Sequence, residues 1–564
     1  MILEGVVKLK TKWVVTCAWP YINTVPHLGT LIGSLLSADI YARYLRHDPD
    51  NEVIFVSGSD EHGTPIEVEA RKMGVDPREL TDKYHEIVKE LIEKFRISFD
   101  NYSRTESETH KKFVRKFYRK IYERGYIFTK DEILPFCNKC NIYLPDRFVE
   151  GRCPHCGYEY AKGDQCENCG RLLDPKDLIN PKCTFCGSKP SFKKSKHWYF
   201  DLPAFEKELK TYIEGHPRLP SNVKNMSLSM IREGLKPRSL TRDNKWGISA
   251  PFPGAENKTI YVWMEAVLGY ISAVIEYFEQ KGNPERWREF WLSKDTKTLF
   301  FIGKDNIPFH IIVFPALLLA SGDGYPLPWQ VSSTEFLMYE GQKFSKSRRI
   351  GIWLDQAIKL LPSDYWRFYL TLIRPETSDS NFSWGDFQRK INNELNDTLG
   401  NLIHRTLSFI NRYFNSEIPN PSEMTEEDKA LLKTVKETTD IVSAKIEEFK
   451  FRDALVEVLN LARKCNSYFN MKEPWKLVKT DKGQASTSLY ILATAIKTIA
   501  VIMEPFLPDT AEKIWETLDL PGNIHTFNWS DAYHPISPGK KIKRSKPLFT
   551  KVDVEKLKSE LSML

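Results

Sequence analysis

Residues 20–30 read Pro-Tyr-Ile-Asn-Thr-Val-Pro-His-Leu-Gly-Thr, and they stand between two strongly patterned segments. Residues 13–17, just before them, are mostly β-branched or aromatic, which predicts a buried strand. Residues 31–46, just after them, carry apolar side chains at helical spacing. The stretch is therefore interpreted as a strand-to-helix turn that places His27, Gly29 and Thr30 at a helix N-terminus.

Such a turn suits a phosphate, because a helix N-terminus offers free N–H groups and a positive dipole end. His27 can donate a hydrogen bond to a phosphate oxygen, and Gly29 lets the backbone approach a flat ligand. A lone His-x-Gly turn is more often structural, so its interpretation depends on a second stretch. Residues 341–347 read Gly-Gln-Lys-Phe-Ser-Lys-Ser, and the lysines at 343 and 346 predict a mobile cationic clamp.

The two stretches resemble the "HIGH" and "KMSKS" motifs of the class I aminoacyl-tRNA synthetases, and further matches resemble the methionyl-tRNA synthetases among them. The resemblance implies catalytic roles for His27, Thr30, Lys343 and Lys346. It implies that the same four residues bind ATP together with Gly29, Gly303, Asp305 and Ser345. Thr30 stands where many relatives have a second His, so we expect His27 and the two lysines to neutralise more of the phosphate charge.

Length and composition predict several domains in an intracellular protein. The chain has 564 residues, of which 41% are hydrophobic, and one domain usually holds roughly 100–200 residues. No apolar run approaches the roughly 18 residues that span a membrane, and the N-terminus has no signal-peptide pattern. We therefore expect a cytoplasmic protein without a membrane segment. A net charge of +7 permits nucleic-acid binding through local patches but does not require it.

The order of patterns predicts an α/β protein followed by an all-α part. Alternating strands and helices predict a Rossmann-type parallel sheet covered on both faces, and long amphipathic patterns after residue 387 predict a helix bundle. The expected divisions are residues 1–127 and 239–335 for the two halves of the sheet domain, 128–238 for an insertion, 336–386 for a linker with the lysine loop, 387–535 for the bundle and 536–564 for a tail.

Eight of the ten cysteines form four Cys-x-x-Cys pairs inside the insertion. This segment has few residues that could form a core, so we expect two tetrahedral zinc sites to fold it, each contributing roughly 10–16 kcal/mol. A reactive redox pair is improbable with four pairs in a row. Spacing leaves the pairing open, since adjacent pairs could share a zinc. The resemblance implies a nested arrangement of structural zinc sites, with Cys153, Cys156, Cys166 and Cys169 in one and Cys137, Cys140, Cys183 and Cys186 in the other.

The remaining matches concern methionine. Residues 58–64, Gly-Ser-Asp-Glu-His-Gly-Thr, read by themselves as a polar turn, and the aromatics of residues 259–270 read as core. The resemblance implies instead that Asp60 pairs with the methionine ammonium and that Arg242 lies near its carboxylate. It implies a methionine pocket formed by Ala18, Trp19, Tyr21, Asp60, Arg242, Trp263, Ala266, Tyr270 and His310. Sulfur packs well at aromatic ring edges, which suits such a pocket.

In the helical part, Asn401 and Arg405 lie one turn apart on one face, and Trp475 follows a helix end. By default these are an exposed polar face and a core Trp. The resemblance implies that they hold the anticodon of tRNA(Met), since unstacked bases are usually read on aromatic rings and Arg. The basic tail at residues 540–546 could touch tRNA phosphates.

The implied reaction joins methionine and ATP into methionyl-adenylate and then transfers the methionyl group to the terminal adenosine of tRNA, with magnesium accompanying ATP. We expect a monomer, because the further C-terminal domain that dimerises many relatives is absent, and a separate tRNA-binding protein acting in trans stays open. Three competing functions are a synthetase for another aliphatic amino acid, a catalytically silent tRNA-binding protein and a zinc-ribbon nucleic-acid-binding protein.

Overall fold

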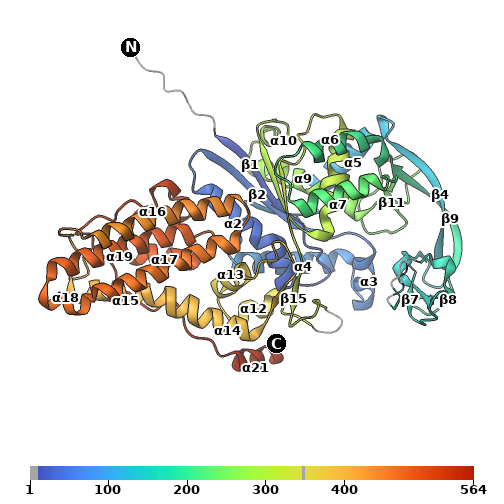
Figure 1. Cartoon of the computed structure of the whole chain (residues 1–564). Helices are drawn as coiled ribbons and strands as arrows, with labels where there is room; N and C mark the ends of the chain where they lie inside the picture. Colours follow the sequence, from blue (N-terminus) through green and yellow to red (C-terminus); the bar gives the residue numbers. More distant parts are fainter. Residues whose placement is uncertain (1–9, 164–165, 167, 170, 172, 346–349) are drawn as a thin grey trace, which may run out of the picture.

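The core of the molecule is a parallel five-stranded sheet, shown in a computed structural model that describes residues 10–163, 166, 168–169, 171, 173–345 and 350–564 (Figure 1). Its strand order is β14-β13-β1-β2-β3. The strands are β1 (Thr11–Cys17), β2 (Asn51–Ser59), β3 (Asn101–Arg104), β13 (Lys297–Gly303) and β14 (Gln330–Thr334). The predicted Rossmann-type sheet is therefore confirmed, and it is built from two segments that are about 200 residues apart in the chain.

The strand order reverses at β1, which pairs with β2 on one side and with β13 on the other. Ligands of open α/β sheets bind beyond the carboxyl ends of the strands at such a switch point. The turn at residues 20–30 follows β1, and Gly303 ends β13 beside it. Both expected ATP-binding segments therefore leave the sheet at the same crevice.

The helix after the turn runs without interruption over residues 28–46, through α1 (Leu28–Thr30), a π-helical turn (Leu31–Leu35) and α2 (Leu36–Arg46). Two amphipathic helices follow further along this half of the sheet domain, α4 (Pro77–Lys94) and α5 (Glu108–Glu123). The sequence pattern does not reveal β3, because Asn-Tyr-Ser-Arg is a short polar edge strand without an apolar run.

The insertion forms an arm that extends away from the sheet (Figure 1). Its stem is the antiparallel pair of β4 (Ile127–Cys137) and β9 (Ser191–Phe200), and its tip holds β6 (Val149–Arg152), β7 (Ala161–Lys162) and β8 (Ile179–Cys183). The helices α6 (Glu206–Gly215) and α7 (Ser221–Arg232) return to the core that covers the sheet.

The C-terminal part is the predicted helix bundle, with α15 (Asn401–Tyr413), α16 (Glu426–Glu447), α17 (Phe451–Lys472) and α19 (Lys482–Met503). Among the described residues, α19 alone is long and apolar enough to cross a membrane, and 94% of its most apolar window is buried inside the protein. A helix that is apolar all round belongs in a core, and α19 is the central helix of the bundle.

A buried ion cluster joins the bundle to the sheet domain. Arg43 of α2 donates to Asp39 at 2.9 Å and to Glu504, just after α19, at 2.5 Å. Glu504 is also bonded by the rings of His47 (3.0 Å) and His525 (2.5 Å). We call Asp39, Arg43, Arg367, Glu504, His47 and His525 the interdomain ion cluster.

We expect Glu504→Gln to lower the free energy of unfolding by about 3–5 kcal/mol, because it leaves the buried Arg43 guanidinium without one of its carboxylates. Urea unfolding at pH 7 measures the change. Glu437→Gln is the control, since the Lys433–Glu437 pair is 77% and 57% exposed and should contribute less than about 0.5 kcal/mol. Equal effects of the two changes would contradict a structural role of the cluster.

Candidate active site

His27 caps the helix that begins at Leu28. Its Nδ1 accepts a hydrogen bond from the Thr30 N–H at 3.3 Å, so its Nε2 carries the proton and is the donor toward a ligand. Burial lowers the pKa of His27 to about 4. His27 is thus a neutral hydrogen-bond donor at pH 7, and the cationic charge at this site has to come from the lysines.

The lysine loop lies directly against this turn. Backbone hydrogen bonds join Leu28 N to Ile352 O (3.1 Å) and Leu354 N to Pro26 O (3.0 Å). The Phe344 ring stacks on the His27 ring with centroids 4.3 Å apart. Gly351 has a φ of +135°, and a Cβ there would lie 2.4 Å from the Phe344 ring, so only glycine admits this packing.

The structure therefore brings the two motifs together although more than 300 residues separate them. The Lys343 ammonium lies 5.9 Å from the centre of the Phe336 ring. Lys346 lies outside the described residues. Gly303 and Asp305 sit across the crevice, where β13 ends, and Ala18 is tied to the same strand by its N–H to Phe301 O (2.9 Å).

Next to the turn lies a largely buried cluster of aromatic side chains. The Trp19 and Tyr270 rings meet edge to face at 6.4 Å, and a Cβ on Gly269 would lie 2.6 Å from Trp19. The Tyr270 hydroxyl bonds His310 Nε2 at 2.6 Å, and His310 Nδ1 bonds the Asn306 carbonyl at 2.9 Å. Because that carbonyl can only accept, His310 Nδ1 carries the proton and Nε2 accepts from Tyr270.

The helix α8 (Val262–Ala266) forms another side of this region. Ala266 is buried, whereas Trp263 is 37% exposed and stacks on Phe309 at 4.8 Å. Tyr21 donates its hydroxyl to the His62 carbonyl at 3.0 Å. The expected pocket residues thus come from five segments. They are the ends of β1 and β2, α8 with its following helix, the helix that holds His310, and the short strand β11 (Thr241–Arg242) that carries Arg242.

Asp60 lies at the end of β2, where its backbone N–H bonds the Pro20 carbonyl at 2.9 Å. It is 5% exposed, and its Oδ1 has no hydrogen-bond partner among the described residues. Burial and the nearby Glu265 raise the pKa of Asp60 well above its ordinary value. A buried carboxylate with an unpaired oxygen is costly by itself and is suited to a cationic ligand group.

Arg242 lies against the ring of Tyr261. Its guanidinium lies 3.8 Å from the centre of the Tyr261 ring, and its Nη1 donates to the Thr241 carbonyl (2.8 Å) and to Ser239 (3.1 Å). Tyr261 directly precedes α8, so it connects Arg242 to the wall that carries Trp263.

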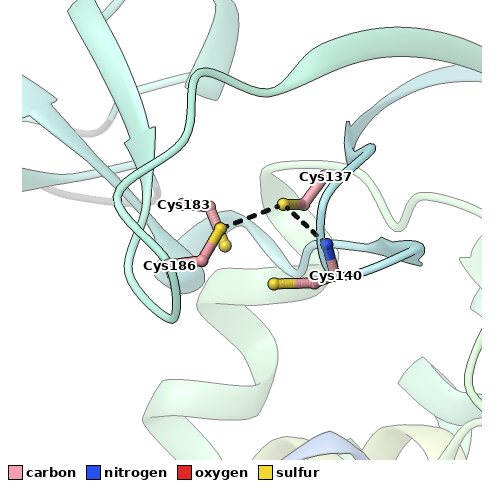
Figure 2. A group of neighbouring side chains, drawn as sticks. All are labelled: Cys137, Cys140, Cys183 and Cys186. Atoms are coloured by element: carbon pink, nitrogen blue, oxygen red, sulfur yellow. Dashed lines mark hydrogen bonds between the residues drawn. The ribbon is translucent and has the colours of Figure 1, made fainter.

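The eight cysteines of the arm form two clusters, each with all its sulfurs within 4.8 Å of one another. Cys137, Cys140, Cys183 and Cys186 make one cluster (Figure 2), and Cys153, Cys156, Cys166 and Cys169 make the other. This is the nested grouping. Three of the Sγ–Sγ distances are 3.4 Å (Cys137–Cys186), 3.6 Å (Cys156–Cys166) and 3.9 Å (Cys153–Cys169). They are close to about 3.8 Å, the edge of a tetrahedron of sulfurs around a metal with 2.3 Å metal–sulfur bonds.

In the bundle, Arg405 and Trp475 meet around one ring. The Arg405 guanidinium lies 4.0 Å from the centre of the Phe469 ring, and Trp475 stacks on the same ring at 5.8 Å. Asn466 and Asn470 hold Arg405 at 2.8 and 3.0 Å, and Asn401 is exposed one turn away. The sequence pattern did not reveal Phe469 and the two asparagines, because α17 presents them to Arg405 only in the folded bundle.

Two family models match the chain. One is described as "tRNA synthetases class I (M)" and matches residues 13–407, and the other is described as "Anticodon binding domain of methionyl tRNA ligase" and matches residues 418–561. A methionine–tRNA ligase of Korarchaeum cryptofilum is 54% identical and covers 98% of each chain. One of Pyrobaculum aerophilum is also 54% identical, over 98% of this chain and 96% of its own.

Among solved structures, Mycobacterium tuberculosis methionyl-tRNA synthetase in complex with methionyl-adenylate has a similar fold. Its TM-score is 0.79 at 24% sequence identity, over 96% of this chain and 99% of that chain.

We expect His310 to make the protein less stable in acid. Burial lowers the pKa of His310 in the folded protein to about 4 from its ordinary value of 6.5. Between these two pH values His310 is protonated in the unfolded chain and neutral in the folded chain. Its contribution of about 3 kcal/mol is present above pH 6.5 and is lost as pH falls toward 4. His310→Gln should flatten the plot of unfolding free energy against pH in this interval.

Proposed function

The chain belongs to the methionyl-tRNA synthetases of class I, and on this premise we propose which of its residues carry out the reaction. The activity is that of a methionine–tRNA ligase. Methionine and ATP give methionyl-adenylate and pyrophosphate, and the methionyl group then passes to the 3′-terminal adenosine of tRNA with release of AMP. The observation that best supports our assignment is the buried Asp60 carboxyl group at the end of β2, whose Oδ1 has no partner among the described residues.

The first step needs alignment more than base catalysis, because the attacking methionine carboxylate is already ionised at pH 7. We assign the His27 Nε2–H to a phosphate oxygen of ATP and the loop lysines, Lys343 and Lys346, to the charge that develops on the phosphates. Thr30 and Ser345 supply further hydrogen bonds. Gly29 and Gly303 lie against the adenosine, and Asp305 binds its ribose. Magnesium enters with ATP and needs few fixed protein ligands.

We infer that packing selects the methionine side chain, while two charged residues bind the ammonium and carboxylate that all amino acids share. Trp19, Trp263, Tyr270 and Ala266 surround the flexible side chain, and His310 lies near its sulfur with Nε2 already occupied by Tyr270. Asp60 pairs with the ammonium. Arg242 acts near the carboxylate from behind the Tyr261 ring, and Ala18 and Tyr21 complete the rim.

We assign the Arg405–Phe469–Trp475 cluster, with Asn401, to the anticodon of tRNA(Met), because it offers a guanidinium and a ring on which an unstacked base can lie. Two cysteine clusters of tetrahedral size are suited to zinc, and we assign them structural roles because all four positions of each are filled by protein sulfur. We propose a cytoplasmic monomer that binds ATP, L-methionine and tRNA(Met), with any additional tRNA-binding protein supplied in trans.

Amino-acid-dependent ATP–pyrophosphate exchange tests this assignment. We expect exchange with methionine and none with leucine, isoleucine, valine or cysteine. His27→Ala should slow it by about 10²–10³-fold, the effect of one lost donor to a transition-state anion. Exchange with another amino acid would overturn the pocket assignment, and no exchange by folded protein would favour a catalytically silent tRNA-binding protein.

Metal removal separates structural from catalytic zinc. Among the described residues, the tip of the arm buries four aliphatic side chains beside its cysteines, so a chelator should unfold it while the parallel sheet stays folded. Limited proteolysis should then cut within residues 137–186, and methionine-dependent exchange should persist. Loss of exchange with an intact arm would show that the metal takes part in the chemistry.

A further inference from the structure

A histidine that the proposed mechanism does not use lies beside the methionine pocket. His62 is fully buried, and both its ring nitrogens face carboxylates. Nδ1 lies 2.6 Å from Glu265 Oε1, and Nε2 lies 2.7 Å from Glu106 Oε1. Carboxylate oxygens accept and do not donate, so both nitrogens carry protons and the ring is a cation between two anions.

The three residues come from three different segments. His62 follows β2 and stands two positions after Asp60, whereas Glu265 belongs to α8, beside Trp263 and Ala266. Glu106 follows β3 and is itself fixed by Arg78 (2.6 Å) and Lys111 (2.9 Å). The imidazolium therefore ties the wall that carries Asp60 to the wall that carries the aromatic residues of the pocket.

The same ring determines how negative charge is distributed at the pocket. Asp60 and Glu265 are both buried, and each has one oxygen, Oδ1 and Oε2, without a partner among the described residues. Burial and Glu265 raise the pKa of Asp60, whereas the His62 imidazolium and backbone N–H act against that rise. The pKa of His62 itself is raised to about 10, because Glu265 and Glu106 outweigh the effect of burial.

We propose that His62 is a positioning residue for the amino-acid substrate, which acts through Glu265 to fix α8 against Asp60 and to keep Asp60 available for the substrate ammonium. The inference rests on the proposed function. Without His62, Glu265 would lose the cation that pairs with it, and Asp60 would lose the charge and the backbone N–H arrangement that act against the rise of its pKa, so Asp60 would take up a proton more readily. The ATP side of the crevice, around His27 and Gly303, has no contact with His62 among the hydrogen bonds and ion pairs of the described residues.

Two substitutions of His62 distinguish the contact with Glu265 from the positive charge of the imidazolium, because both remove the charge and only one keeps the contact. His62→Gln places an amide near the Nε2 position and keeps the contact to Glu106, whereas His62→Asn places it near Nδ1 and keeps the contact to Glu265. We expect His62→Gln to raise the KM for methionine at least about tenfold and His62→Asn to raise it about threefold or less. The KM for ATP should stay within about twofold in both, measured by pyrophosphate exchange.

His47→Gln is the matched control. His47 is also fully buried and bonded at both nitrogens, to Glu504 (3.0 Å) and to the Phe527 carbonyl (2.6 Å), but it lies in the interdomain ion cluster. A general loss of stability would affect His47→Gln and His62→Gln alike, whereas a specific rise of the methionine KM would affect only His62→Gln.

The proposal is overturned if Gln and Asn at position 62 act equally, if the ATP and methionine KM values rise together, or if the control reproduces the effect. Should His62→Gln not fold, Glu265→Gln decides, because it weakens the same tie from α8. A methionine KM that this change leaves unaltered would refute the proposal. Failure of the proposed function itself would show separately, as wild-type protein without methionine-dependent exchange.

Discussion

The arrangement of the whole molecule depends on one buried carboxylate, Glu504. It lies at the end of the central bundle helix and takes hydrogen bonds from Arg43 and two histidines. Arg43 in turn shares Asp39 with Arg367, at 2.9 and 2.8 Å. Moving these charges out of water is expensive, and only complete pairing compensates for it. The bundle can therefore dock on the sheet domain in one orientation, in which every member of the cluster has its partner.

The helix over residues 28–46 connects this cluster to the chemistry. Its first residues follow His27 at the crevice, and its last turn carries Arg43 in the interdomain ion cluster. Because the helix is continuous, the position of the turn at residues 20–30 depends on the contact with the bundle as well as on β1. The interdomain ion cluster and the buried carboxylates near the expected methionine pocket differ in one respect. The carboxylates of the interdomain cluster pair within the protein, whereas Asp60 and Glu265 near the pocket each keep an oxygen unpaired, which is where a cationic ligand adds most.

Local sequence patterns predicted the elements and could not predict their partners. The strand at residues 13–17, the turn and the bundle helices follow from periodicity, and the polar strand β3 does not. The His62–Glu265 contact joins positions 203 residues apart, and the Arg43–Glu504 contact joins positions 461 apart, so no window of sequence contains either. The charge state of His27 also depends on burial, which a motif does not show. Spacing left the cysteine pairing open, and the nested grouping came from family resemblance.

The arm is energetically separate from the active site for a physical reason. The stem strand β4 is exposed or half-buried along most of its length, with Ile133 73% and Phe128 42% exposed, and β9 is exposed over residues 192–194, whereas its last residues pack in the core of the sheet domain. Among the described residues, the small core of the tip is separate from that larger core. The tip can therefore draw little stability from the packing of the sheet domain and needs its own source. The two four-cysteine clusters lie where such a source is needed, since metal–sulfur bonds at a cluster that holds a metal stabilise a fold without requiring a large buried surface. Changes in the sequence or structure of the cysteine-containing tip therefore need not disturb the crevice at β1.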